Sequence, residues 1–190
     1  MLTPRQNEIL DAALILISED GIQRLTMKRL SASLGITEPA IYRHFTSKAE
    51  ILQQMIQRFD VEIPAEESLH GLAGIEAFLR ARAAQVMAQP ALARVLFAEE
   101  LFLNDPACSE LLLNLMHRHR AALCRFFEEA QADGEIRSGI DRKTLFRLVL
   151  GPFRLLIRQW GLSGQAFLLE EELNALLTAL HESLKPNGSC

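Results

Sequence analysis

Polar, aromatic and basic side chains are concentrated in residues 37–51, which read TEPAIYRHFTSKAEI. Tyr42, Arg43 and His44 are consecutive there, and Lys48 follows four residues after the histidine. Arginine can donate two hydrogen bonds to a guanine in the major groove, and lysine and tyrosine commonly contact phosphates. The opening threonine and the N–H groups of a helix start can also meet a phosphate. Any one of these side chains could be an ordinary surface group, but their combination indicates contact with DNA.

Patterns that would indicate other chemistry are absent from the sequence. It contains no glycine-rich phosphate loop, no His-Glu-x-x-His motif and no paired nucleophile and base. The adjacent pairs Glu99-Glu100 and Glu128-Glu129 would point in different directions on a helix. Cys108, Cys124 and Cys190 are odd in number and too widely spaced for a disulfide framework or a zinc site. We therefore expect no enzymatic activity, no cofactor and no bound metal.

The net charge of −4 hides an uneven distribution of charge along the chain. Residues 22–48 contain five basic side chains and one acidic side chain, whereas residues 59–190 contain 13 basic and 18 acidic ones. A small basic patch on an acidic protein is suited to local contact with a polyanion. The sequence has no run of 18 apolar residues and no signal peptide, so we expect a cytoplasmic protein without membrane association.

A first helix is predicted from residue 4 to residue 20. Thr3 and Gln6 form a capping box, with Pro4 at the first helical position, and Gly21 is a typical C-terminal stop. The apolar residues of this helix fall on one face, namely Ile9, Leu10, Ala13, Leu14 and Ile17.

Two short helices follow, and their spacing predicts a helix-turn-helix. The first runs from about residue 26 to residue 34 and is ended by Gly35, and the second is capped by Thr37 and reaches about residue 44. A second capping box, from Ser47 to Glu50, begins a fourth helix. The small core under the two short helices is expected to contain Leu30, Leu34, Ile36, Ile41 and Phe45.

The helix-turn-helix assigns a role to the exposed residues, because its second helix enters the major groove and its first helix crosses the backbone. Thr26 and Lys28 are then placed near phosphates. Lys48 lies in the first turn of the fourth helix, where the helix dipole disfavours a cation, and a nearby phosphate would explain it. Arg43 could contact either guanine or phosphate. The candidates for base contacts are Thr37, Glu38, Pro39 and Arg43.

Residues 9–52, ILDAALILISEDGIQRLTMKRLSASLGITEPAIYRHFTSKAEIL, resemble the DNA-binding domain of the TetR family of bacterial transcriptional regulators. The resemblance is carried by the helix that ends at Gly21, by the turn at Leu34-Gly35 and by the Tyr-x-His-Phe-x-x-Lys motif that begins at Tyr42. One small departure is Ser31, where the family more often has alanine. The resemblance covers about a quarter to a third of the chain, and it implies DNA contacts by Thr26, Lys28, Thr37, Tyr42, His44 and Lys48.

The rest of the chain is predicted to be helical, so that the fold class is all-α. Helices are expected at about 69–88, from Pro90 to about 104–106, and at 106–132, 142–161 and 165–184, with an irregular connection at 61–68 and a kink and close helix contact at Gly151-Pro152. We divide the chain into a head, residues 1–47, which binds DNA, and a body, residues 48–185, which binds an effector and dimerises. Residues 186–190 are expected to be a disordered tail.

The last two helices are strongly apolar on one side, which fits either an ordinary core or a dimer interface. The resemblance implies a homodimer built from these two helices in a four-helix bundle, and two-fold symmetry would then require a pseudo-palindromic operator in double-stranded DNA. The predicted dimer residues are Leu148, Leu155, Leu173, Leu176, Leu177 and Leu180.

An effector pocket in the body is implied mainly by the resemblance. His119 lies on an apolar helix face, where it is either a hydrogen-bonded core residue or a ligand contact. The predicted pocket residues, which could instead simply fill the core, are Met87, Phe97, Phe102, Met116, His119 and Trp160. Such a lining would suit a small hydrophobic effector.

The functional hypothesis is a dimeric, site-specific transcriptional repressor that a small-molecule effector releases from its operator. The alternative is a DNA-binding protein of the same fold without a small-molecule switch. Such a protein would act in chromosome organisation or through a protein partner.

Overall fold

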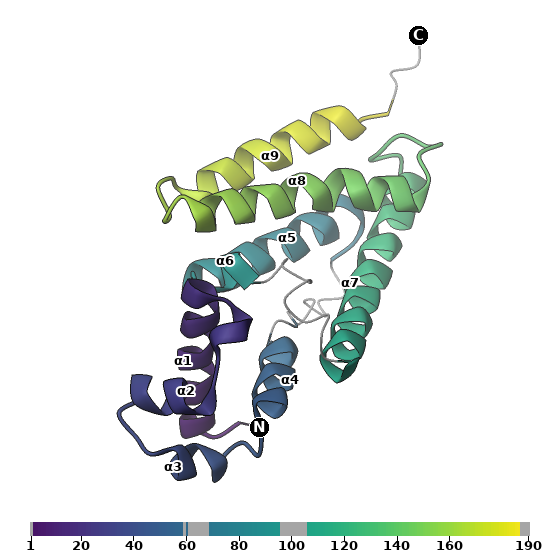
Figure 1. Cartoon of the computed structure of the whole chain (residues 1–190). Helices are drawn as coiled ribbons and strands as arrows, with labels where there is room; N and C mark the ends of the chain where they lie inside the picture. Colours follow the sequence, from purple (N-terminus) through teal and green to yellow (C-terminus); the bar gives the residue numbers. More distant parts are fainter. Residues whose placement is uncertain (1, 59, 61–68, 96–105, 187–190) are drawn as a thin grey trace. The chain divides into compact units, whose positions relative to one another are not determined.

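The computed structural model describes residues 2–58, 60, 69–95 and 106–186, and these residues form helices joined by short connections without any strand (Figure 1). The predicted all-α fold, with an N-terminal helix-turn-helix followed by a larger helical part, is confirmed. None of the described helices is both long and apolar enough to span a membrane.

The chain divides into two compact units. One contains residues 1–60 and 94–115, and the other contains residues 61–93 and 116–190. Helix α4 (Lys48–Arg58) packs against α1 (Pro4–Asp20) and therefore belongs to the first unit. The functional division into a head and a body at residue 47 remains a prediction.

Helix α1 begins and ends as the sequence predicts. The Thr3 hydroxyl accepts a hydrogen bond from the Gln6 N–H at 3.2 Å, and Gln6 Oε1 accepts one from the Thr3 N–H at 2.9 Å. Gly21, with φ of 82°, ends the helix before a short 3-10 turn, η1 (Ile22–Arg24). All five predicted core residues of α1 are buried, namely Ile9, Leu10, Ala13, Leu14 and Ile17.

The two short helices are α2 (Met27–Ser33) and α3 (Glu38–Tyr42). Helix α3 ends two residues earlier than predicted, because the N–H groups of His44 and Phe45 both donate to the Ile41 carbonyl, at 2.8 and 3.0 Å. Of the predicted core residues, Leu30, Ile41 and Phe45 are buried, whereas Leu34 and Ile36 are half-buried.

The second capping box forms only in part as predicted. The Ser47 hydroxyl accepts a hydrogen bond from the Glu50 N–H at 3.2 Å, but the Glu50 carboxylate does not return to the Ser47 N–H. The Glu50 carboxylate instead accepts from the N–H and the hydroxyl of Thr46, at 2.6 and 2.7 Å. The cap therefore extends back to Thr46. These hydrogen bonds to the charged carboxylate hold the pKa of Glu50 below its usual value.

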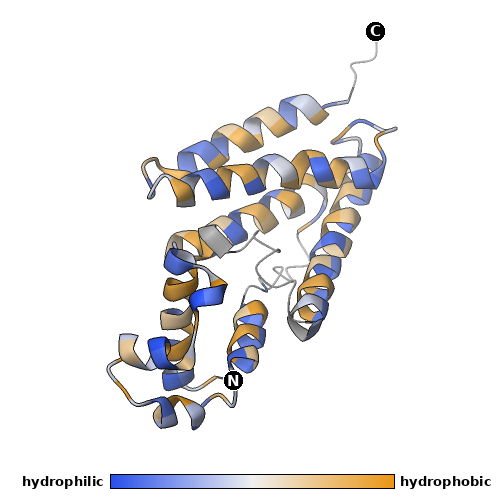
Figure 2. Ribbon diagram, viewed as in Figure 1, coloured by the Kyte–Doolittle hydropathy of each residue, from blue (hydrophilic) through white to orange (hydrophobic). Residues whose placement is uncertain are grey.

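The second unit contains α5 (Gly71–Ala88), α8 (Arg142–Leu162), α9 (Leu169–Leu184) and most of α7 (Pro106–Ala132). Helices α8 and α9 lie side by side, and α5 contacts both (Figure 1). Apolar residues recur along these helices between hydrophilic ones (Figure 2). The buried ones include Phe78, Leu79, Leu123, Phe126, Phe127, Leu145, Val149, Phe153, Ile157, Leu173 and Leu177.

Two glycines allow close helix contacts in this unit. A Cβ on Gly74 would lie 2.3 Å from Phe126 Cδ1, so glycine lets α5 approach α7. A Cβ on Gly161 would lie 2.6 Å from the Cβ of Ala93, in the short helix α6 (Leu92–Val95). The close contact predicted at Gly151, next to Pro152 inside α8, is not made among the described residues of one protomer, because a Cβ there would meet nothing within 4 Å.

Long-range carboxylates cap the start of α5. Glu129 Oε2 accepts from the Gly71 N–H at 3.1 Å, and Glu135 Oε2 accepts from the Leu72 N–H at 2.8 Å. Both carboxylates are far from α5 in sequence, and a negative charge at a helix N-terminus is favourable. Helix α9 begins at residue 169 instead of 165, because Gly164 and Gln165, with φ of 70° and 68°, form the preceding turn.

Candidate nucleic-acid interface

The turn between α2 and α3 is held by short-range hydrogen bonds. The Gly35 N–H donates to the Ala32 carbonyl at 3.2 Å, and the Ile36 N–H donates to the Ser31 carbonyl at 3.0 Å. Gly35 has φ of 64°, a value that glycine adopts without strain. Ser31, the departure noted in the sequence, is buried, and its hydroxyl donates to the Lys28 carbonyl at 2.9 Å. The serine hydroxyl is therefore satisfied within its own helix.

All nine predicted DNA-contacting residues lie at the surface of the first unit. Tyr42 is 48% exposed although it is aromatic, because the neighbouring Ile41 is the residue that points into the core. Six of the nine are exposed, namely Thr26, Lys28, Thr37, Pro39, Tyr42 and Arg43, and three are half-buried, namely Glu38, His44 and Lys48. DNA contact by these residues remains a prediction.

The two short helices differ at their N-termini. The Thr26 hydroxyl accepts from the Arg29 N–H at 3.1 Å and thereby caps α2. Thr37 occupies the same position before α3, but its hydroxyl makes no capping hydrogen bond within that helix. Because residue 39 is proline and has no N–H, the start of α3 presents the hydroxyl of Thr37, the N–H of Glu38 and the Glu38 carboxylate.

Lys48 is held by the protein itself. Its Nζ donates to the carbonyl oxygen of Ile22 at 2.8 Å, which connects the start of α4 to the turn before α2. Partial burial lowers the pKa of the Lys48 ammonium. An ammonium has three N–H donors, so this hydrogen bond leaves donors for a phosphate.

An ion pair reduces the number of unpaired positive charges in residues 22–48. Arg29 forms an ion pair with Asp20, which lies just outside the segment whose charges were counted. The exposed cations near the two short helices are therefore Arg24, Lys28 and Arg43, with Lys48 half-buried. Pairing between α1 and α2 was not visible in the sequence, because the two residues are nine positions apart and on different helices.

One contact of this surface was missed by the sequence analysis. The side-chain amide of Gln6 donates from Nε2 to the carbonyl oxygen of His44 at 3.2 Å, while its Oε1 takes part in the capping box of α1. The sequence indicated the capping role of Gln6 and gave no signal for the contact with His44, which is 38 residues away.

The comparison with protein families agrees with this geometry. Residues 9–55 match the family model of bacterial regulatory proteins, tetR family, whose DNA-binding domain includes the helix-turn-helix described above. Residues 9–55 therefore form a DNA-binding domain of the TetR type. The match covers most of α1, all of α2 and α3 and most of α4, and it includes all nine predicted DNA-contacting residues.

Curated relatives of this chain include nucleoid occlusion factors named SlmA. The one from Idiomarina loihiensis is 24% identical over 186 residues, which are 95% of each chain. The one from Glaesserella parasuis is 28% identical over 130 residues, which are 65% of this chain and 59% of the relative, so that this match spans less than two thirds of it. The one from Escherichia coli is 48% identical, but over 54 residues, 28% of this chain and 27% of the relative.

Solved structures share the whole fold of this chain at low sequence identity. The ketosteroid transcriptional regulator KstR2 of Mycobacterium tuberculosis matches with a TM-score of 0.83 and 15% identity over 98% of both chains. The TetR family transcriptional regulator PfmR from Thermus thermophilus matches with a TM-score of 0.76 and 22% identity, over 92% of this chain and 97% of that one. These similarities establish the fold of the second unit as well as the first.

The predicted dimer residues divide into two groups by their exposure. Leu173 and Leu177 are buried inside their own protomer. Leu148 and Leu155, by contrast, are 45% and 57% exposed on α8, and Leu176 and Leu180 are half-buried on α9. The exposed leucines are the ones that could contact a second copy without unfolding the first.

The predicted pocket residues differ in how exposed their side chains are to solvent. Met87 and Met116 are partly exposed, whereas Trp160 is buried and donates from Nε1 to the Phe167 carbonyl at 3.1 Å. Phe97 and Phe102 lie outside the described residues. These positions remain predicted contacts of an effector.

His119 has a polar partner that the sequence analysis missed. Arg82 is buried in α5, and its Nη2 lies 3.0 Å from Nδ1 of the His119 ring. The Arg82 Nη1 donates to Gln85 at 2.8 Å, and the ring of Phe78 packs edge-to-face against His119 at 5.4 Å. The sequence gave no signal for the burial of Arg82, because arginine on a helix is usually exposed.

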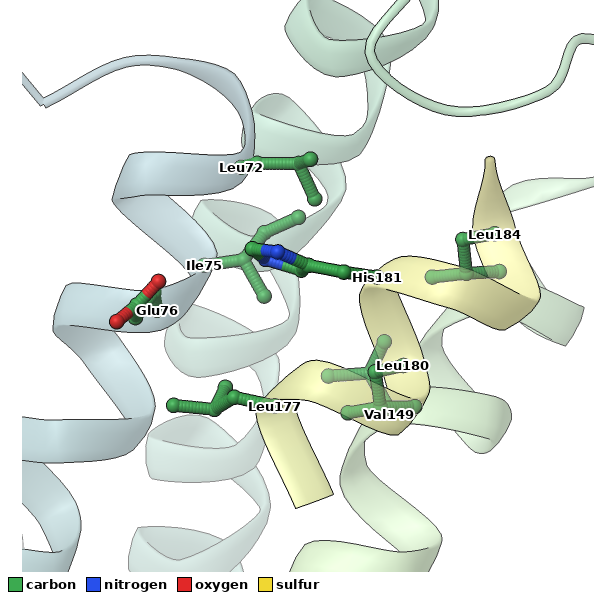
Figure 3. A pocket seen from close by; sticks show the side chains of 8 residues that line it. All are labelled: Leu72, Ile75, Glu76, Val149, Leu177, Leu180, His181 and Leu184. Carbon is green, nitrogen blue, oxygen red and sulfur yellow. The ribbon is translucent and has the colours of Figure 1, made fainter. Parts of the chain in front are cut away.

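A small hollow lies between α5, α8 and α9 (Figure 3). Its volume of about 10 Å³ is close to the space of one water molecule. Pockets that bind small ligands occupy roughly 300–1,000 Å³, so this hollow is a gap in the packing. It is lined by Leu72, Ile75, Glu76, Val149, Leu177, Leu180, His181 and Leu184.

Proposed function

We propose that this protein is a dimeric, sequence-specific transcriptional repressor that places α3 of each head in a major groove of double-stranded DNA. The observation that carries the proposal is the start of α3, where the Thr37 hydroxyl makes no capping hydrogen bond and Tyr42 and Arg43 are exposed nearby. A surface threonine at a helix start normally caps the helix. Here its hydroxyl is available for DNA.

The contacts follow from the position of each group. Thr37 and the start of α3 face the bases or an adjacent phosphate, and Arg43 donates to guanine or to phosphate. Thr26 and Lys28 at the start of α2 contact the backbone, as does Tyr42 through its hydroxyl. Lys48 and His44 complete the backbone contacts, while Glu38 and Pro39 face the bases. The cationic contacts give binding that weakens as salt increases.

The dimer interface of the proposal is the exposed apolar stripe of α8. Leu148, Leu155 and Leu162 are 45%, 57% and 68% exposed, and they are seven residues apart, so they lie along one face. Leu176 and Leu180 on the adjacent helix α9 extend this face. Leu173 and Leu177 support it from inside the protomer. Two-fold symmetry then presents two heads to a pseudo-palindromic operator.

Release from the operator is assigned to an effector that binds in the body. A small, mainly hydrophobic effector that binds in the body would favour a dimer whose heads are wrongly spaced for the operator. A coupling free energy of about 1–3 kcal/mol between effector and DNA lowers operator affinity roughly 5- to 150-fold. His119 and its partner Arg82 are polar groups that could orient such an effector.

The similarity to nucleoid occlusion factors favours a second candidate function. The relative from Idiomarina loihiensis, matched over 95% of both chains, carries that name and not the name of a metabolic repressor. On this alternative, the protein binds many chromosomal sites, has no small-molecule switch and acts in chromosome organisation or through a protein partner.

Recovery of genomic DNA fragments by the purified protein at near-physiological salt distinguishes the two functions. A repressor recovers a pseudo-palindrome beside a few promoters, whereas the alternative recovers the same motif at many dispersed positions. The matched control is the Thr37→Val variant, which keeps the shape of the side chain and removes the hydroxyl from the start of α3. Diffuse recovery by the unmodified protein, no different from that of the control, would contradict both functions.

A further inference from the structure

The amide of Gln6 uses both of its ends. Oε1 accepts from the Thr3 N–H at 2.9 Å and from the Thr3 hydroxyl at 3.2 Å, and Nε2 donates to the His44 carbonyl at 3.2 Å. The partners determine the orientation of the amide, since a backbone N–H can only donate and a carbonyl oxygen can only accept. Gln6 therefore caps α1 and holds the chain just after α3 at the same time.

The contact acts on a peptide unit that is held from both sides. This unit joins His44 to Phe45, so it carries the His44 carbonyl and the Phe45 N–H. The carbonyl accepts from Gln6 at 3.2 Å, and the N–H donates to the Ile41 carbonyl at 3.0 Å. The Phe45 side chain, 1% exposed, is buried in the core. The peptide unit after α3 is thus held by two hydrogen bonds, one to the Ile41 carbonyl of α3 and one from Gln6 of α1.

We propose that Gln6 is a positioning residue for DNA recognition, which sets the placement of α3 through the His44 carbonyl. The inference rests on the proposed function, because it assigns Gln6 to the same DNA-binding surface. Tyr42 and Arg43 lie between Ile41 and the held peptide unit, so a displacement of this unit moves both side chains. Base contacts require closer placement than phosphate contacts, since hydrogen bonds weaken steeply away from good geometry. Loss of the Gln6 donor therefore lowers sequence preference more than overall DNA affinity.

Gln6→Glu and Thr3→Ala separate the hydrogen bond to His44 from the cap of α1. Gln6→Glu keeps an acceptor for the Thr3 N–H, because glutamate serves equally well in a capping box, but it removes the donor to His44. Gln6→Met removes both groups without adding charge. Thr3→Ala weakens the same cap and leaves the Gln6 donor in place. Asn7→Asp adds one negative charge at the next residue and controls for the charge of the glutamate.

The experiment measures the affinity of each variant for the selected operator and for random-sequence DNA, at low and at high salt. We expect Gln6→Glu and Gln6→Met to lower the ratio of the two affinities by about 2- to 10-fold for each head, the equivalent of one hydrogen bond, or roughly 4- to 100-fold for a dimer. Thr3→Ala and Asn7→Asp should leave the ratio unchanged. The loss should persist at high salt, where an effect of added charge is screened.

An unchanged ratio for both Gln6 variants, with circular dichroism showing a folded protein, would overturn the inference and leave the proposed function intact. An equal loss for Thr3→Ala would also overturn it, because the cap and not the contact with His44 would then be responsible. If the unmodified protein itself prefers no sequence, the proposed function fails and the inference fails with it. Hydrogen exchange of the Phe45 amide in the DNA-free protein gives a separate readout, and it should accelerate in Gln6→Glu but not in Asn7→Asp.

Discussion

The ammonium of Lys48 donates a hydrogen bond to the carbonyl oxygen of Ile22 at 2.8 Å. This contact joins the first turn of α4 to the turn before α2, across 26 residues of sequence. A lysine that was predicted from its position to bind phosphate is therefore also a structural link within the first unit. The two roles can be separated by experiment.

Replacement of Lys48 by methionine is expected to have two effects. The Ile22 carbonyl loses its partner, which should lower the free energy of unfolding by about 0.5–1.5 kcal/mol. One phosphate contact is lost from each head, so the slope of log affinity against log salt should decrease by roughly 0.9 per head. Denaturant unfolding and fluorescence anisotropy at several salt concentrations measure the two effects. A lower stability with an unchanged salt slope would show that Lys48 has only the structural role.

Arg43 and Lys28 are both exposed, but they should respond differently to alanine substitution. Lys28→Ala removes a backbone contact and should weaken binding to all sequences alike. Arg43→Ala, if the guanidinium contacts guanine, should cost about 1–3 kcal/mol at one base pair of each half-site and relax the preference there. Binding to an operator library with single-base changes distinguishes these results. An even loss across the library for both variants would assign Arg43 to the backbone.

A charge on the exposed face of α8 should separate the proposed dimer. Leu155 is 57% exposed in the protomer, so Leu155→Glu should leave the fold intact and yield monomers, as measured by light scattering. Leu113, on α7, is 54% exposed and provides a matched control, because Leu113→Glu should remain dimeric. A persistent dimer of Leu155→Glu would place the interface elsewhere.

Glu50 should contribute a pH-dependent part of the stability. Its carboxylate accepts two hydrogen bonds from Thr46, which lower its pKa in the folded state. A carboxyl group whose pKa is lowered by folding stabilises the protein fully above its unfolded pKa of about 4.3. This stabilisation decreases as the pH falls from there through the folded pKa.

The comparison of the unmodified protein with Glu50→Gln tests this dependence. The carboxylate is only partly buried and is screened by solvent, so the difference in the free energy of unfolding should be small, about 0.5 kcal/mol at neutral pH. Urea unfolding at a series of pH values should show this difference constant above about pH 5 and decreasing below it. A difference that grows on acidification has the wrong sign for this mechanism.

The sequence predicted those features of the head that depend on residues close together in the sequence. The Thr3–Gln6 capping box and the stop at Gly21 were found where the pattern placed them. The core residues Leu30, Ile41 and Phe45 are also buried as predicted. Local capping geometry and helix periodicity determine these features, and both are visible in a short stretch of sequence.

Contacts between distant residues could not be predicted. The bonds from Gln6 to His44 and from Lys48 to Ile22 join a side chain to a backbone carbonyl, and a carbonyl has no residue-type signature. The cap of α5 by Glu129 could not be predicted either, because Glu129 and Gly71 are 58 residues apart in sequence. Burial of Arg82 in α5 contradicted the usual behaviour of arginine, and apolar spacing alone could not reveal it.

Helix α3 contains five residues, and this limits how much of an operator one head can specify. With a rise of 1.5 Å per residue, the helix is roughly 7.5 Å long, about two steps of a DNA strand. Two steps span about three base pairs, so one head would meet a match about once in every 64 positions by chance, and a genome offers at least 10⁶ competing sites. Two such heads at a fixed spacing distinguish about six base pairs, a match about once in 4,000 positions. The information that locates an operator therefore resides in the pairing of two heads and in the distance between them.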